Sequence, residues 1–405
     1  MNHSETLMST EQFREEVRDW LETNCPDSMR QGSVHFEDAY EIYQTEDALL
    51  WQERAATRGW TAPTWPSEYG GGGLDPSESR VFWEEMARIK ALPASTGMGL
   101  AMIGPTILEM GTEEQKARHI PKIVTGEAQW CQGYSEPGAG SDLAGLQTKA
   151  AVDGDNFIIN GQKIWTSGAQ HANWMFALVR TDPEASKHNG ISFVLLSMDQ
   201  PGVTVKPIKL ISGSSPFCET FFDNAVAKRE DLIGELNKGW TVGKRLLQYE
   251  RNATASRGPA KKKTDKKTKP KLNAYAEIAK TYAGEDSSGK ISDTSIRDEV
   301  LTQTIQEKAL SLTTLRVVEE SKNAGAPGAA TSIFKYVGST LSRDGSQLKS
   351  RLRGTAGLAW VGSEFTENEL ESTRGWLRDR AVTIYGGTNE VQLNIISKRV
   401  LGLPD

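Results

Sequence analysis

The chain has 405 residues and a net charge of -6, with 37% hydrophobic and 25% charged residues. Such a composition is typical of a soluble globular protein of two or three domains, and the lack of a basic field disfavours binding to nucleic acid or anionic lipid. The three cysteines lie far apart in the sequence, without metal-ligand spacing, which disfavours a disulfide framework and favours a reducing, cytoplasmic compartment. Residues 1–15 are polar and include acids, which argues against a targeting peptide, and no apolar stretch is long enough to cross a membrane.

The first third of the chain is predicted to be helical. Apolar residues recur at helical spacing over residues 10–60 and again from about 77 to 126. Between these regions, the Trp-, Pro- and Gly-rich stretch 59–74 predicts an ordered loop. We therefore expect an N-terminal helical domain over residues 1–128.

The middle of the chain carries the pattern of short β-strands. Asp153-Gly154-Asp155-Asn156 predicts a hairpin turn. Further apolar runs bounded by turn residues predict strands near 157–161, 174–179, 191–196, 203–205 and 220–222. This spacing predicts a small β-domain over residues 129–236.

From about Asn237 the pattern becomes helical again, and we expect a C-terminal helical domain over residues 237–405. Two long helices are predicted near 292–324 and 331–352, with a Gly- and Pro-containing loop at 325–328 between them. The Lys-rich segment 261–271 predicts a solvated loop, with phosphate binding as the alternative.

Two short motifs in the β-domain carry polar side chains next to glycines. The first is Tyr134-Ser135-Glu136-Pro137-Gly138-Ala139-Gly140-Ser141-Asp142, and the second is Gly161-Gln162-Lys163-Ile164-Trp165-Thr166-Ser167-Gly168. Glycines allow close backbone approach, and a Trp followed by two hydroxyls suits a flat aromatic ligand. Taken singly, each motif is better explained as an ordinary turn or a core Trp.

In combination the motifs are far more specific. Together with the segments 60–74, 234–240 and 386–404, they occur in the order and spacing of the acyl-CoA dehydrogenase family, which the chain resembles over nearly its whole length, except about 258–292. The resemblance implies an α+β fold with an N-terminal helical domain, a central β-domain and a C-terminal four-helix bundle. It also implies that FAD binds between the last two domains, usually within a homotetramer.

Matching the family's motifs position by position assigns roles to individual residues. The resemblance implies that FAD is contacted by Tyr134, Ser135, Trp165, Ser167, Thr388 and Glu390. It implies substrate contacts from Ser141, near the thioester, and from Arg251. No metal site is expected.

The catalytic base departs from the most common family pattern. In many members the residue two before the Thr of the C-terminal motif is the catalytic glutamate, and here that residue is Gly386. Glu250 shares one helical face with Trp240, Gly243 and Leu247, beside an apolar strip of Val242, Leu246 and Tyr249. A helix apolar over so wide an arc is expected to be largely buried, where a glutamate is costly unless it is paired or functional.

Periodicity alone leaves a catalytic and a structural Glu250 equally open. The resemblance favours the catalytic interpretation, because one branch of the family carries its base in a Leu-x-x-Glu-Arg setting, matched here by Leu247, Glu250 and Arg251. That branch includes enzymes for dicarboxylic or bulky acyl-CoA substrates.

A second departure concerns the partners. Many members carry an Arg followed by Phe-Gly that holds the FAD of a neighbouring subunit, and no such motif follows residue 251. This departure leaves open a homotetramer or a heteromer with a second dehydrogenase subunit. As for activity, the resemblance implies an FAD-dependent dehydrogenase that forms a trans-2-enoyl-CoA and reduces an electron-transfer flavoprotein. Two alternatives stay open: a catalytically silent partner subunit, and a flavin acyl-CoA oxidase.

Overall fold

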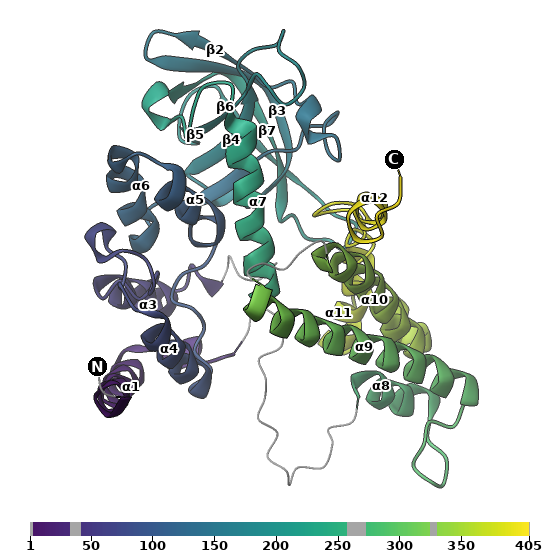
Figure 1. Ribbon diagram of the computed structural model, residues 1–405. Helices are drawn as coiled ribbons and strands as arrows, with labels where there is room; N and C mark the ends of the chain where they lie inside the picture. Colours follow the sequence, from purple (N-terminus) through teal and green to yellow (C-terminus); the bar gives the residue numbers. More distant parts are fainter. Residues whose placement is uncertain (1–2, 33–41, 257–272, 325–329, 405) are drawn as a thin grey trace. The chain divides into compact units, whose positions relative to one another are not determined.

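The computed structural model describes residues 3–32, 42–256, 273–324 and 330–404, so the segments 261–271 and 325–328 lie outside it. The elements follow the predicted order of helices, strands and helices (Figure 1). Contacts divide the chain into two compact units, one of residues up to 208 with 215–260, the other of 209–214 with the residues from 261 onwards. The domain boundaries at 128/129 and 236/237 stay predictions. Among the helices of the described ranges, none combines the length and apolarity needed to cross a bilayer.

The N-terminal part of the first unit consists of helices, with a capping box at the start of α4 and an interruption after it. The main helices are α1 (His3–Asn24), α3 (Glu46–Thr57), α4 (Pro76–Arg88), α5 (Gly104–Met110) and α6 (Glu113–Thr125). A capping box between Asp75 and Glu78 starts α4. The region predicted as continuously helical from 77 to 126 is interrupted after α4, where Lys90 has a positive φ of 58° and Pro93 lacks an N–H donor. Helical structure resumes with a π-helical turn, Gly99–Ile103.

The stretch 59–74 is an ordered loop, as predicted, with a 3₁₀ turn at Ser67–Tyr69. Its glycines allow two parts of the loop to meet. A Cβ added at Gly71 would lie 2.4 Å from the carbonyl oxygen of Trp65, so only glycine fits there.

The β-domain contains one sheet of seven strands in the described part of the chain. The strands are β1 (Trp130–Gly133), β2 (Lys149–Asp153), β3 (Asn156–Ser167), β4 (Trp174–Arg180), β5 (Ile191–Ser197), β6 (Val203–Ile208) and β7 (Phe217–Lys228). Their order is β1-β4-β2-β3-β7-β6, and β5 pairs with β4. The predicted hairpin is confirmed, with Asp153 opposite Asn156. The sequence did not predict β1, which is four residues long and pairs in parallel with the distant β4.

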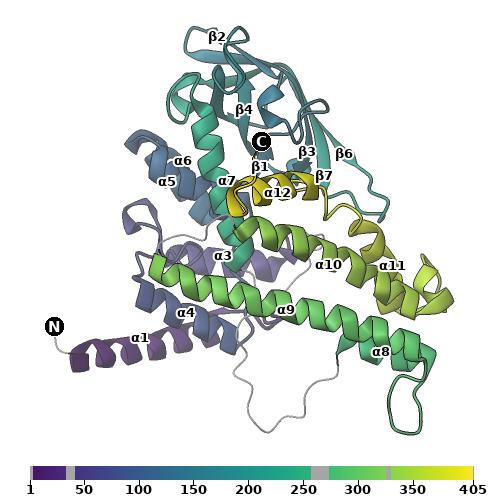
Figure 2. The same cartoon turned by 45° about the vertical axis from the view of Figure 1, so that its right-hand side comes forward.

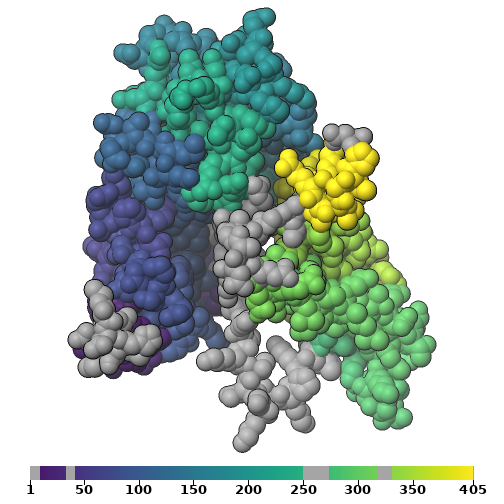
Figure 3. Space-filling model, in the orientation of Figure 1, coloured from purple at the N-terminus to yellow at the C-terminus, as the bar shows by residue number. Residues whose placement is uncertain are grey.

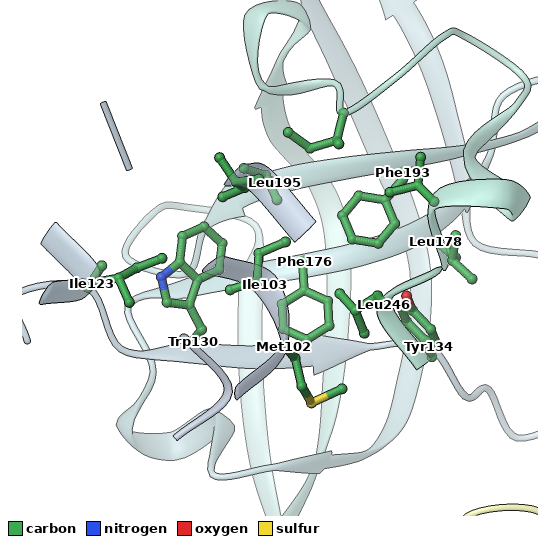
Figure 4. Close-up of a cluster of buried hydrophobic side chains, with 14 of the residues drawn as sticks. Met102, Ile103, Ile123, Trp130, Tyr134, Phe176, Leu178, Phe193, Leu195 and Leu246 are labelled. Carbon is green, nitrogen blue, oxygen red and sulfur yellow. The ribbon is translucent and has the colours of Figure 1, made fainter. Parts of the chain in front are cut away.

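Helix α7 (Gly239–Ser256) packs within the first unit against β4, β5 and α5. Its buried residues Val242 and Leu246 join a core with Phe176 and Phe193, whose rings stack with centroids 6.1 Å apart (Figure 4). Its opposite side is exposed at Thr241, Lys244 and Gln248, and the helix is visible at the surface beside α5 in the space-filling view (Figure 3). The helix was expected to be largely buried, but within the first unit only one side of it is buried.

The second unit is helical, with α8 (Ala274–Ala283), α9 (Thr294–Ala324), α10 (Ala330–Leu352), α11 (Glu367–Arg378) and α12 (Asn389–Ile395). Helices α9 and α10 match the two long helices predicted from the sequence. Helix α10 is central and contacts each of the other four, with α9 and α12 on different sides of it (Figure 2). Tyr275, Val300 and Leu348 form part of the core.

Candidate cofactor and substrate site

The loop after β1 is tied to strand β3 by both backbone and side chain. The Ile164 N–H donates to the Ser135 carbonyl oxygen at 2.9 Å. The fully buried Lys163 donates from Nζ to the Tyr134 carbonyl at 3.1 Å and to Glu136 Oε1 at 2.8 Å. These bonds bring the two sequence motifs together, because Lys163 and Ile164 belong to the second motif and the three acceptors to the first.

The Glu136 carboxylate is almost fully satisfied. Besides Lys163, it accepts from the backbone N–H groups of Gln147 at 2.6 Å and Thr148 at 2.9 Å. Burial opposes the charged form of Glu136, but Lys163 and these donors outweigh it and hold its pKa below the usual value. Burial lowers the pKa of Lys163 to about 8, against the opposing effect of Glu136. Both groups are therefore charged at neutral pH, and they form a buried ion pair.

Trp165 lies in a β-bulge of β3. Lys163 pairs with Thr220 and Thr166 with Cys218, so three steps along β3 face two along β7. Trp165 absorbs the extra residue with a φ of 61°, an uncommon conformation for a bulky side chain, and 52% of its surface is exposed. Backbone strain of this kind gathers at functional sites. Ser167, half-buried, ends the strand.

The loop from Glu136 to Asp142 is open on its outer side. Apart from the glycine itself and its two chain neighbours, no heavy atom of the described residues lies within 4 Å of a Cβ built on Gly138 or Gly140. Ser141 is exposed, and Asp142 forms an exposed ion pair with Lys187 at 2.8 Å. The loop can therefore present backbone and hydroxyl groups to a ligand without rearranging its support.

Helix α7 lies directly against the first motif. A Cβ added at Gly243 would lie 3.3 Å from the Tyr134 hydroxyl oxygen and 3.2 Å from Leu178 Cδ1. Tyr134 itself is buried, with Phe176 and Phe193 at its ring edges, 6.1 and 6.4 Å between centroids. The backbone of Glu250 and Arg251 continues α7, and their side chains lie outside the described part.

The remaining predicted cofactor residues lie in the second unit. Thr388 caps α12, and its hydroxyl oxygen accepts from the Val391 N–H at 3.2 Å. Glu390 is exposed in the first turn of that helix. Because the Thr388 oxygen serves as an acceptor, its O–H stays available to donate to a ligand.

Gly386, where the resemblance implies the base of many family members, has a lysine for a neighbour. Its φ is +64°, and the atom nearest to a Cβ built there is Lys335 Cε, at 3.6 Å. Lys335 donates from Nζ to the Val382 carbonyl at 2.5 Å and lies 5.0 Å from the Tyr385 ring centroid. Burial lowers the pKa of Lys335, which has no carboxylate partner among the described residues.

Comparisons with known proteins identify the family. The family models of the acyl-CoA dehydrogenase N-terminal, middle and C-terminal domains match residues 8–127, 131–225 and 237–401. The chain is 35% identical to acyl-CoA dehydrogenase IpdE1 of Mycobacterium tuberculosis over 98% of its own length and 99% of the relative's. The chain belongs to the acyl-CoA dehydrogenase family. The resemblance and the three-part fold predicted from the sequence are confirmed, and the relatives are named as dehydrogenases, which are oxidoreductases.

Two of the solved structures that are similar to this chain are named with two components. The steroid ACAD Tcur3481-Tcur3483 is 28% identical with a TM-score of 0.73 and covers 98% of both chains. The ChsE4-ChsE5 complex from Mycobacterium tuberculosis is 27% identical with a TM-score of 0.70, at the same coverage.

In this acyl-CoA dehydrogenase, four of the predicted cofactor residues lie on two segments that the structure joins, namely Tyr134, Ser135, Trp165 and Ser167. Thr388 and Glu390 lie together in the other unit. Sequence reasoning missed the ion pair of Glu136 and Lys163, although both residues lie in the quoted motifs. The one available indication was that Lys163 continues the every-second-residue series of Phe157 and Ile159 beyond the predicted strand 157–161.

We expect Lys163→Met to destabilise the first unit by about 3–5 kcal/mol, because Glu136 would be left as an uncompensated buried charge. Adding Glu136→Gln should recover much of this loss. Chemical denaturation followed by circular dichroism measures both. Lys187→Met is the matched control, since it removes an ion pair of the same length that is about 60% exposed and should cost less than about 1 kcal/mol.

Equal stability of the Lys163→Met and Lys187→Met variants would contradict the account.

The ion pair should also make stability depend on pH. Because the folded pKa of Glu136 lies below its usual value, the contribution of Glu136 to the free energy of unfolding is present at neutral pH and is lost as the pH falls through that lowered pKa. The difference between wild type and Lys163→Met should therefore shrink in acid.

Proposed function

We propose that this protein catalyses the FAD-dependent α,β-dehydrogenation of an acyl-CoA thioester to a trans-2-enoyl-CoA and passes the electrons to an electron-transfer flavoprotein. The observation that carries the proposal is the joining of the Tyr134–Asp142 and Trp165–Ser167 segments beside α7 in a chain of this family. That arrangement supports the proposal, because the segments assigned to the cofactor and the helix of the candidate base belong to one unit.

The residues present fit a flavin. The open backbone at Gly138 and Gly140, the exposed indole of Trp165 and the hydroxyls of Ser135 and Ser167 suit a flat, polar-edged ring system. We also assign polar contacts with FAD to Thr388 and Glu390, on the resemblance of the C-terminal motif to the family's. When bound, FAD would supply the acceptor for the hydride that leaves the substrate β-carbon.

The protein's own task is to remove a weakly acidic α-proton. This requires a carboxylate at the α-carbon and hydrogen-bond donors at the thioester carbonyl. We assign the base to Glu250, the thioester end of the substrate to the region of Ser141, and a further substrate contact to Arg251. A structural role for Glu250 is the competing explanation.

We further propose that the protein works with a second dehydrogenase subunit on a bulky acyl-CoA. The missing Arg-Phe-Gly segment leaves one FAD contact unfilled, and two of the similar solved structures are two-component assemblies, one of them named a steroid ACAD. A catalytically silent role for this chain in such an assembly is the rival function, and Gly386 favours it if Glu250 is not a base. The cytoplasmic location stays a prediction.

We expect the purified protein, alone or with its partner subunit, to carry flavin that is released on denaturation and is bleached anaerobically by an acyl-CoA. Glu250→Gln keeps the shape of the side chain and removes its basicity, so bleaching should slow by about 10²–10⁴-fold at unchanged flavin content. Stopped-flow absorbance measures the bleaching rate, and the visible spectrum before mixing gives the flavin content. Unchanged bleaching in Glu250→Gln would assign the base to another residue. A colourless protein that cannot be reconstituted with FAD, alone or with a partner subunit, would contradict the proposed enzymatic function.

The vacated position at Gly386 gives a second test. We expect Glu250→Thr to be nearly inactive and Gly386→Glu to restore part of its rate. Recovery should be incomplete for two reasons: a side chain at φ +64° is strained by about 1–2 kcal/mol, and Lys335 would pair with the new carboxylate and weaken it as a base. Adding Lys335→Met should therefore raise the recovered rate.

The measurement is anaerobic bleaching of the single, double and triple variants, with flavin content checked in each. A double variant that folds, holds flavin and is no faster than Glu250→Thr would argue against convergence of the two base positions on one substrate carbon. A triple variant slower than the double would reject the proposed effect of Lys335.

A further inference from the structure

A group of polar side chains holds helix α7 at the turn before residue 250. We call Glu109, Arg245 and Tyr249 the Glu109 clamp. Arg245 Nε donates to Glu109 Oε2 at 2.7 Å, and the Tyr249 hydroxyl donates to the same oxygen at 2.5 Å. The Arg245 guanidinium also lies 4.9 Å from the Tyr249 ring centroid. One carboxylate oxygen of α5 therefore receives two donors from α7, which lies beside it (Figure 1).

The clamp restrains rotation of α7. Arg245 and Tyr249 are four residues apart and share one face of the helix. Val242 and Leu246 belong to the same broad face and lie in the apolar core, so the clamp adds polar bonds beside the buried strip of α7. A rotation of α7 by one residue, about 100°, would break both bonds to Glu109. Because residue 250 directly follows Tyr249 in α7, whatever fixes the helix there also fixes the backbone at position 250.

The charges of the clamp suit a lasting contact. Hydrogen bonds from Arg245 and Tyr249 hold the pKa of Glu109 below its usual value. Burial and the neighbouring Glu109 raise the pKa of Tyr249, which keeps its hydroxyl a donor at neutral pH. The side chains of Glu109 and Arg245 are 42% and 40% exposed, and ion pairs this exposed contribute little to stability. Their effect is therefore on geometry rather than on folding.

We propose that Glu109 and Tyr249 are positioning residues for the base at Glu250, which they orient by fixing the rotation of α7. This inference rests on the proposed function. It adds Glu109, in the N-terminal helices, and Tyr249, which stands at an unspecified position of the Leu-x-x-Glu-Arg setting. Neither is assigned contact with the substrate.

The chain supplies a closely matched control. A second group likewise joins a tyrosine and a basic side chain to one glutamate. The Tyr69 hydroxyl donates to Glu113 Oε2 at 2.5 Å, and Lys116 Nζ donates to Glu113 Oε1 at 2.8 Å. This group joins the 59–74 loop to α6. Tyr69→Phe and Glu113→Gln thus remove the same chemistry at a site apart from the bonds between α5 and α7.

The experiment compares Tyr249→Phe and Glu109→Gln with these two controls. We expect all four variants to keep the wild-type melting temperature and flavin content. In the clamp variants alone, the anaerobic bleaching rate at saturating acyl-CoA should fall by roughly 10- to 100-fold, without a change in the half-saturating concentration, because small misplacements of a reacting group have effects of this size. Arg245→Lys should retain more activity than Arg245→Met.

Hydrogen exchange gives a readout that does not depend on activity. The amides of α7 after Tyr249 should exchange faster in the clamp variants and unchanged in the controls. Clamp variants with wild-type bleaching, or with a lowered melting temperature and no specific change in α7 exchange, would overturn the proposal. Failure of the proposed function is distinguishable, because wild-type protein would then lack flavin bleaching, or Glu250→Gln would bleach at the wild-type rate.

Discussion

The buried ion pair of Glu136 and Lys163 holds the candidate site of the first unit together. Its ammonium reaches two backbone carbonyls as well as the carboxylate, and the carboxylate receives two further backbone donors. A buried charge is tolerated only when its hydrogen-bonding capacity is satisfied in this way. Once Lys163 is fixed, the bulge that follows it in β3 sets where Trp165 leaves the sheet, and the carbonyl bond to Tyr134 sets where the open loop begins. Removing either charge would disturb both segments at once.

Helix α7 completes this arrangement through contacts of three kinds. Leu246 and Val242 lie in the core with the aromatic residues of β4 and β5, Gly243 allows close approach to Tyr134, and the Glu109 clamp holds the side of the helix. Together these contacts restrain the depth, the distance and the rotation of the helix. A base that must meet one carbon atom of a substrate benefits from all three, which gives a physical reason for carrying it on this helix.

The elements with local patterns could be predicted from the sequence. The hairpin at Asp153–Asn156 depends on adjacent turn residues, and α9 and α10 on long helical periodicity, so all three were found. Strand β1 was missed, because its partner β4 lies far along the chain. The features of the candidate site likewise divide into those with a local sequence signal and those that depend on distant parts of the chain. Family motifs indicated Tyr134, Trp165 and Thr388, whereas the burial of Lys163 and the positive φ of Trp165 depend on pairing with β7 and on loop carbonyls that no local pattern reveals.

The central claim, that the proton-abstracting base is on α7, is tested most directly by covalent labelling. Removal of an α-proton from a 3-alkynoyl-CoA gives a 2,3-allenoyl thioester, an electrophile that is attacked by a carboxylate placed at the reacting carbons. The assembled protein would be treated with this compound, digested with trypsin and analysed by mass spectrometry. The account predicts one adduct, on Glu250 in the peptide of residues 246–251, and none in the Glu250→Gln variant. An adduct on another residue, or one that persists in that variant, would contradict it.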